Sequence, residues 1–153
     1  MPTPAFLVRL MQYRGLSRSV RIGPEDSECL AFATELRAAA LEGRLRAVWT
    51  HPANELAGMV RKGPGGKVIV PAQVALVRAL GLITGTADYL FMMRDGSLAI
   101  EFKSKNGSMT EGQKDFKAWA EMVGVPFHVV RSAEQGLAVL EQCGALTRKG
   151  APS

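Results

Sequence analysis

Residues 81–113 have the sequence GLITGTADYLFMMRDGSLAIEFKSKNGSMTEGQ, and this stretch decides the fold that we predict. Two apolar runs, at about 87–93 and 98–103, flank Asp95-Gly96, a pair that is typical of a tight turn between antiparallel strands. We therefore predict a β-hairpin. Because side chains alternate between the two faces of a strand, Glu101 and Lys103 share the face opposite to that of the apolar residue Phe102.

Asp88 lies in the first of these strands. If the strands pair symmetrically about Asp95-Gly96, Asp88 lies opposite Lys103 and diagonal to Glu101, whereas a one-residue bulge would break this arrangement. Two neighbouring carboxylates repel each other, and a bound divalent cation is the usual compensation; oxygen ligands favour Mg²⁺ or Mn²⁺. A lysine beside them can position water or neutralise charge that develops on a phosphate under attack. The alternative is a solvated hairpin face with an ordinary Glu–Lys pair.

Other short motifs precede and follow the hairpin. They are Ser27-Glu28, His51-Pro52-Ala53-Asn54-Glu55, Gly81, Gly85, Ala87-Asp88, Ile100-Glu101-Phe102-Lys103, Gly107, Thr110, Gln113, Gly124-Val125-Pro126 and Val129-Val130-Arg131-Ser132. In this order and spacing, over residues 25–142, the chain resembles the virus-type replication–repair nuclease (VRR-NUC) family of the PD-(D/E)XK nuclease superfamily. It departs from the family in two places: residues 84–88 lack the prolines that often precede the aspartate, and residues 56–80 exceed a minimal connection.

The resemblance implies an α/β fold with a restriction-endonuclease-like PD-(D/E)XK core, in which helices flank a small mixed sheet. It also implies a metal-dependent DNA nuclease that hydrolyses phosphodiester bonds, acts on branched DNA such as Holliday junctions and forms a homodimer. Two alternatives remain open: a non-catalytic nucleic-acid-binding module, and a flap- or end-directed nuclease.

The same resemblance implies roles for individual residues. The catalytic residues would be Asp88, Glu101, Lys103 and Gln113. The ligands of Mg²⁺ or Mn²⁺ would be Asp88, Glu101 and the main-chain carbonyl of Phe102, with Glu28 and Glu55 as additional candidates. Three of these residues have a plain alternative: Glu28 as a helix N-terminal charge, Glu55 as part of a turn or helix start, and Gln113 as a surface glutamine.

The composition is consistent with this function without requiring it. The chain has 153 residues, of which 47% are apolar, enough for one domain with one core. A formal net charge of +5 suits a polyanionic partner. Cys29 and Cys143 have no metal-site spacing and are expected to be reduced thiols. No membrane-spanning run and no signal peptide is recognisable, so we expect a soluble cytoplasmic protein of a bacterial or phage-infected cell.

We divide the chain into a basic extension (1–22), the VRR-NUC domain (23–143) and a mobile tail (144–153). The extension carries four arginines and no acid; it is interpreted as a packed arm, a mobile basic extension or an ordinary N-terminal element. In the domain we predict helices at 24–42, 71–80, 111–123 and 133–142, and further strands at 45–50 and 127–130, the last parallel to its neighbour. The expected buried face of the first helix is Cys29, Ala33, Leu36 and Ala40, and that of the third is Phe116, Trp119, Ala120 and Val123.

Several cations are candidates for contacts with DNA phosphates. Three lie on a flexible Gly/Pro-rich loop at 61–67, one follows the hairpin, and two lie along the predicted helix at 111–123. They are Arg61, Lys62, Lys67, Lys105, Lys114 and Lys117. The glycines of the loop do not have the spacing of a nucleotide-binding P-loop, and a solvated loop is the alternative.

Overall fold

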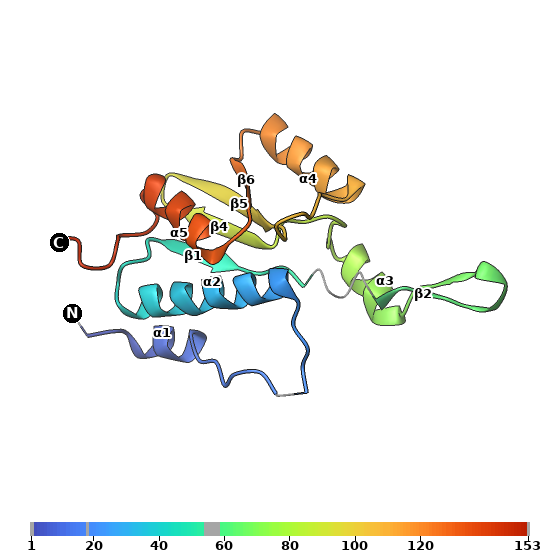
Figure 1. Ribbon diagram of the computed structural model, residues 1–153, viewed down its shortest axis with the longest axis horizontal. Coiled ribbons are helices and arrows are strands. Elements are labelled where there is room, and N and C mark those ends of the chain that lie inside the picture. Colours follow the sequence, from blue (N-terminus) through green and yellow to red (C-terminus); the bar gives the residue numbers. More distant parts are fainter. Residues whose placement is uncertain (1, 18, 54–58, 153) are drawn as a thin grey trace.

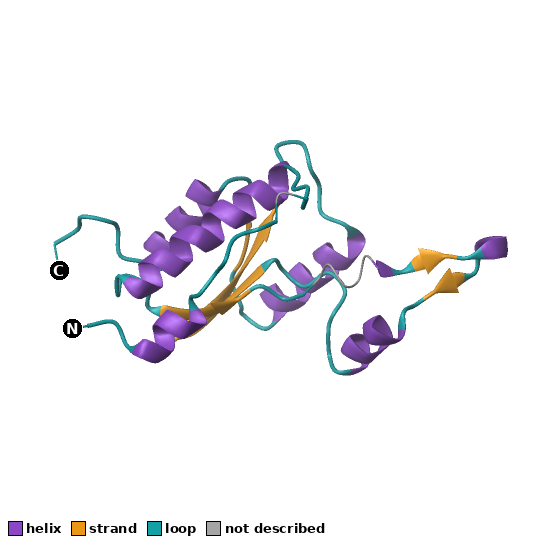
Figure 2. Cartoon of the chain, turned by 90° about the horizontal axis from the view of Figure 1, so that it is seen from below, coloured by secondary structure: helices purple, strands orange, loops and turns teal. Residues whose placement is uncertain are grey.

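A four-stranded mixed sheet lies at the centre of the protein, with helices on both of its faces (Figures 1 and 2). The computed structural model describes residues 2–17, 19–53 and 59–152. The strand order is β1-β4-β5-β6, formed by β1 (Ala47–Thr50), β4 (Tyr89–Met93), β5 (Gly96–Phe102) and β6 (Phe127–Val130). Only the β5–β6 pair is parallel. The predicted α/β fold with a small mixed sheet flanked by helices is therefore confirmed.

The β4–β5 hairpin forms as predicted but in a different register. Met93 pairs with Gly96 and Tyr89 with Ile100, so the turn is made by Arg94 and Asp95. A tight turn of the type favoured by Asp-Gly needs positive φ at both central residues. No described non-glycine residue has positive φ, and neither does Gly96. The pairing is thus shifted by two residues, which leaves every side chain on its predicted face.

The main core lies between the sheet and two helices, α2 (Pro24–Leu41) and α5 (Ala133–Gln142). Phe32 and Leu36 of α2 are fully buried, and the Phe32 ring lies 5.0 Å from Tyr89 and 5.2 Å from Phe102, centroid to centroid. The predicted buried stripe is therefore confirmed for Ala33 and Leu36. Cys29 and Ala40 are only partly buried, and Phe32 and Ala39 complete the buried face instead. This packing fixes the first turn of α2 at one edge of the sheet.

The other face of the sheet is covered less completely. Helix α4 (Glu111–Met122) has Ala120 as its only buried residue, whereas Trp119 is 51% exposed and Val123 59% exposed. The predicted buried face of this helix is thus wrong for Trp119 and Val123. The reason is that α4 packs toward β6, so that Val48 and Met92, on the same sheet face near β1, also stay exposed.

Both ends of the chain pack on this core. Helix α1 (Ala5–Leu10) contacts α2, Thr3 donates a hydrogen bond to the Leu41 carbonyl (2.8 Å), and the Arg37 guanidinium lies 4.5 Å from the centre of the Tyr13 ring. The tail predicted to be mobile from residue 144 is wrong for its first part, because Ala145 and Leu146 are buried. Both cysteines are free thiols. No helix in the described ranges has the length and hydropathy needed to cross a bilayer.

The segment that follows β1 forms a projecting arm, which we define as residues 59–70. It is a two-stranded hairpin, β2 (Arg61–Lys62) and β3 (Val68–Ile69), with a 3-10 turn at Pro64–Gly66, and α3 (Ala72–Ala79) follows it. The predicted loop at 61–67 is therefore wrong for Arg61 and Lys62, which form β2, whereas residues 63–67 form the turn of the hairpin. Positive φ at Gly65 and Gly66 lets the chain reverse at the tip. Figures 1 and 2 show the arm standing clear of the central sheet.

Candidate active site

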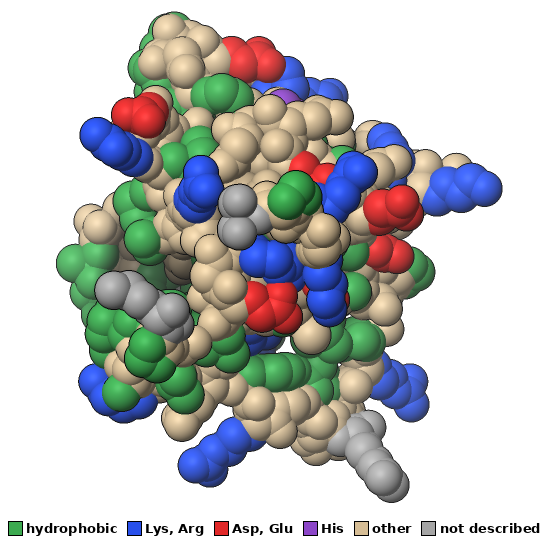
Figure 3. All heavy atoms as spheres, turned by 90° about the vertical axis from the view of Figure 1, so that its left-hand side faces the viewer, with side chains coloured by type: hydrophobic (Ala, Val, Ile, Leu, Met, Phe, Trp, Pro, Cys, Tyr) green, Lys and Arg blue, Asp and Glu red, His purple; other side chains and the backbone are tan. Residues whose placement is uncertain are grey.

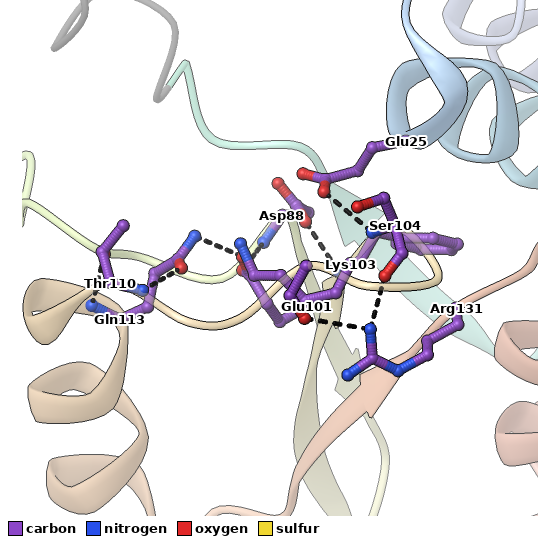
Figure 4. A network of polar contacts seen from close by, with 10 residues as sticks. Glu25, Asp88, Glu101, Lys103, Ser104, Thr110, Gln113 and Arg131 are labelled. Carbon is purple, nitrogen blue, oxygen red and sulfur yellow. Dashed lines mark hydrogen bonds and ion pairs between the residues drawn. The ribbon is translucent and has the colours of Figure 1, made fainter.

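The four predicted catalytic residues meet at the edge of the sheet where β4 begins and β5 ends (Figure 4). The observed register, continued by one residue, places Asp88 opposite Glu101 rather than opposite Lys103. The Asp88 N–H donates to Glu101 Oε2 (3.2 Å), and Asp88 Oδ2 accepts from the Phe102 N–H (2.7 Å). Each carboxylate is therefore held by the backbone of the opposite strand.

Glu101 and Lys103 form a buried ion pair. Lys103 Nζ lies 3.1 Å from Glu101 Oε1, and the two side chains are only 8% and 1% exposed. The same Glu101 oxygen accepts a hydrogen bond from Gln113 Nε2. The alternative of a solvated hairpin face does not hold, because a surface pair would keep its charges in water. A buried pair of this kind costs desolvation energy and must be kept intact by its neighbours.

Gln113 reaches Glu101 because it is fixed at the start of α4. Its Oε1 accepts from the Thr110 N–H (2.9 Å), and its own N–H donates to Thr110 Oγ1 (3.3 Å), which is a capping box. The amide oxygen thus caps the helix while the amide nitrogen faces the site. Gln113 is therefore not the surface glutamine of the alternative interpretation.

The loop before β4 is pressed against the same helix turn. Gly85 has φ +87°, and a Cβ atom built on it would lie 2.2 Å from the backbone of Gly112. Only glycine fits this contact, which holds the approach to Asp88 against the first turn of α4. Gly85 is thus a structural requirement of the site.

Burial governs the charge of the two carboxyls. Burial, and then the nearby Asp88 carboxylate, raise the pKa of Glu101 to about 7, although Lys103 opposes the shift. Burial also raises the pKa of Asp88, against the opposing effects of the Phe102 N–H and His51. Both carboxyls therefore hold their protons at higher pH than free side chains do, and a bound cation would favour their ionised forms.

An acidic residue that the sequence did not single out lies at the same edge. Glu25, in the first turn of α2, accepts a hydrogen bond from the Ser104 N–H (3.1 Å) and points toward Asp88 in Figure 4. Its negative charge contributes to the raised pKa of Asp88. The signal in the sequence was the acidic first turn of a helix that begins at this edge.

Glu28 is not at the site. Its Oε2 accepts from the Ala133 N–H (2.7 Å), at the first turn of α5, so the assignment of Glu28 to the metal environment is corrected. Glu28 lies about one helical turn after Glu25, and this places its carboxylate over α5 instead of the end of β5. Glu55, the other additional candidate, lies outside the described residues, as does Asn54.

Two further side chains shape the surroundings of the site. His51 Nδ1 lies 2.5 Å from the Asp88 carbonyl oxygen, and its ring contacts Tyr89. Arg131 donates to the carbonyls of the turn after β5, including that of Gly107 (3.0 Å). Arg131 thereby fixes the turn that carries Lys105, whose side chain is exposed.

The remaining predicted DNA contacts differ in their surroundings. Lys114 pairs with Glu111 (2.8 Å) and Lys117 pairs with Glu121, so both charges are compensated within α4. Arg61, Lys62 and Lys67 are exposed on the arm, away from the carboxylates. The structure does not gather these cations into one patch.

The carboxyl groups provide a small set of metal donors. Within the described ranges, no group of three or more His, Cys, Asp or Glu side chains is arranged to hold a metal ion. Asp88 and Glu101 supply two carboxylates beside the Phe102 backbone, and Mg²⁺ commonly binds through one or two carboxylates while keeping several waters. The donors therefore fit a partly hydrated hard cation. Comparisons of this chain with protein-family models, curated proteins and solved structures find no match.

Proposed function

We propose that this protein is a metal-dependent DNA nuclease with a PD-(D/E)XK core and a site like that of the VRR-NUC family. The observation that carries the proposal is the meeting of Asp88, Glu101, Lys103 and Gln113 at one buried sheet edge. Burying Glu101 and Lys103 beside a half-buried Asp88 is costly for a fold, and a role in stability alone explains it poorly. Perturbed carboxyl pKa values at such a position also favour a functional site.

Each residue has a distinct task in this proposal. Asp88, Glu101 and the Phe102 carbonyl would hold Mg²⁺ or Mn²⁺, which when bound would activate water and screen phosphate charge. Lys103 can donate up to three hydrogen bonds, and one toward Glu101 leaves others for the attacking water and the phosphate oxygens. Gln113, locked by its capping box, keeps Glu101 in place. Glu25 adds negative charge beside Asp88 and so strengthens the attraction for a cation.

The resemblance extends the proposal to the substrate and the assembly. Branched DNA such as a Holliday junction is the proposed substrate, and a homodimer would hold the duplex branches of the junction. The exposed apolar side chains of α4, Trp119 and Met122, and the neighbouring Val123 support a surface that pairs with a second copy. The proposed location is the cytoplasm of a bacterial or phage-infected cell.

Cleavage of labelled DNA tests the activity. A four-way junction, a flap and a linear duplex are incubated with Mg²⁺, Mn²⁺ or EDTA. We expect the wild-type protein to cut only with metal, and Glu101→Ala to remove both cutting and Mn²⁺ binding measured by calorimetry. Lys103→Met should lower the cleavage rate at least ~100-fold while DNA affinity stays within about tenfold, because the lysine acts mainly on the transition state.

Lys149→Met is the control, because Lys149 is exposed and is not among the candidate contacts with DNA. It should keep nearly full cleavage activity. Circular dichroism of each variant separates loss of catalysis from loss of folding. Tight DNA binding without cutting in any metal would contradict the proposal and favour the non-catalytic binding module.

A further inference from the structure

The basic excess of the protein is confined to two segments of the chain. Residues 56–87 contain four Lys or Arg residues and no acid, and residues 1–24 likewise contain four arginines and no acid. The other 11 Lys and Arg residues are outnumbered by the 14 Asp and Glu residues, so the net charge of +5 comes entirely from these segments. Figure 3 shows the end of the molecule opposite the arm, where acidic and basic side chains are interspersed.

The arm is a thin hairpin that carries two of its cations on one face. Arg61 pairs with Ile69 across the hairpin, and the Gly63 N–H donates to the Lys67 carbonyl (2.7 Å), so Arg61 and Lys67 share one face. A Cβ atom at Gly63 would lie 2.7 Å from Ile69 Cδ1, so Ile69 packs directly over the glycine and the hairpin stays thin. An isolated two-stranded hairpin is only marginally stable in water, so this arm would gain from a partner.

The arm is connected to the edge of the sheet that holds the carboxylates. The chain returns from α3 through Gly85, which packs on α4 beside Gln113, and then reaches Asp88. A groove of about 550 Å³ lies between this return segment and α4, with Arg78 of α3 and Gly112 of α4 among its lining residues. The lining of this groove holds one cation, Arg78, and one acid, Asp115, so the excess of cations on this side of the site comes from the arm itself.

We propose that the arm is a second DNA contact, which holds the phosphate backbone of duplex DNA flanking the cleaved bond. This inference rests on the proposed nuclease function and deepens it: the substrate must carry a double-stranded segment long enough to reach the arm. The partner is a polyanion because the segment has cations and no acid over 32 residues. Contacts of lysine and arginine with phosphates carry no base recognition, so the arm contributes affinity without sequence preference.

The test compares two variants that lose the same charge. R61A/K62A/K67A removes the cations of the arm, and R94A/R148A/K149A removes three exposed cations elsewhere. Affinity for a junction with long duplex arms is measured by fluorescence anisotropy in EDTA at several salt concentrations. We expect the arm variant to bind at least tenfold more weakly and to lose about 2–3 from the slope of log K against log salt, since each phosphate contact contributes about 0.9. The control variant should change the slope by less than about 1.

Cleavage and assembly measurements complete the test. With Mg²⁺ and DNA below its dissociation constant, the arm variant should cut more slowly in proportion to its weaker binding, whereas the control variant should cut like wild type. Equal slopes for the two variants, or no DNA binding by the wild type, would overturn the inference. So would a changed mass in light scattering with an unchanged slope, which would assign the arm to a second copy of the chain. Arm-dependent binding without cleavage would uphold this inference and refute the nuclease.

Discussion

At the scale of single residues, Glu101 determines the charge of the site. Its carboxyl is nearly inaccessible, contacts Lys103 and Gln113, and lies across the hairpin from Asp88. The positive charge of Lys103 only partly offsets the effect of burial on the Glu101 carboxyl, because the pKa of Glu101 remains raised to about 7. Without a bound cation, the Glu101 carboxyl is therefore partly protonated near neutral pH.

This raised pKa predicts how stability depends on pH. The ordinary pKa of the side chain is 4.5, so in the unfolded chain Glu101 ionises first, and folding favours its protonated form. The stabilisation is complete below pH 4.5 and is lost as the pH rises through 7. Between pH 5 and 8 the metal-free protein should lose roughly 2–3 kcal/mol of unfolding free energy from this group, an upper value for a carboxyl paired with lysine.

Urea denaturation at each pH in EDTA measures this loss. Glu101→Gln should flatten the decline, whereas Glu111→Gln, at an exposed position on α4, should leave it unchanged. Saturating Mn²⁺ should also flatten it in the wild type, because the cation favours the ionised carboxylate. A decline that persists undiminished in Glu101→Gln would refute the assignment to this residue.

The sequence was sufficient to predict which face each strand residue occupies, because alternation along a strand is local. Glu101 and Lys103 share a face as predicted, even though the pairing differs by two residues. It was not sufficient to choose between Glu25 and Glu28. Both are acids at the start of α2, and only the angle of that helix against the sheet brings Glu25 to Ser104 and directs Glu28 to α5.

At the scale of elements, the loop before β4 and the first turn of α4 act as one unit. Gly85→Ala should lower the unfolding free energy by about 2–4 kcal/mol, because the new methyl group meets the Gly112 backbone at 2.2 Å and the residue already has positive φ. It should also weaken Mn²⁺ binding, since Gln113 would move away from Glu101. Denaturation and calorimetry provide the two measurements.

Gly43→Ala is the matched control for Gly85→Ala. Gly43 also has positive φ (+72°), but open space surrounds its Cβ position and it lies at the far end of α2. Its replacement should cost only about 1 kcal/mol and leave Mn²⁺ affinity unchanged. Equal effects of the two substitutions would mean that backbone conformation, and not the contact with α4, sets the role of Gly85.

Elements whose signals are local were predicted well, and those that depend on distant contacts were not. The helices predicted at 111–123 and 133–142 begin after Thr110 and Ser132, which cap them, and capping needs only the next few residues. The arm was missed because Gly and Pro dominate its sequence, and two residues per strand give no periodic pattern. Burial of Leu146 was missed because it depends on Leu45, about one hundred residues earlier in the chain.

At the scale of the whole molecule, the excess positive charge lies in other segments of the chain than the residues of the candidate active site. The acids of the site and their buried lysine belong to the sheet edge. The excess positive charge belongs to residues 56–87, which include the arm, and to the N-terminal segment. Such a division suits an enzyme that attracts a polyanion over a distance and reserves its carboxylates for a cation. It also means that the proposed DNA binding and the proposed cleavage can be altered independently by substitution.

The N-terminal segment provides the last test of this separation. Deletion would remove α1 and its contacts with α2, so we choose Arg14→Ala with Arg21→Ala, two exposed positions. If this segment contacts DNA together with the arm, the two substitutions should reduce the slope of log K against log salt by about 1–2 without changing the melting temperature. When these two substitutions are combined with R61A/K62A/K67A, the losses in salt slope should sum, because distant sites act independently. R94A/R148A controls for net charge. An unchanged slope would exclude both arginines from the proposed DNA contact and leave only the proposed contact of the arm.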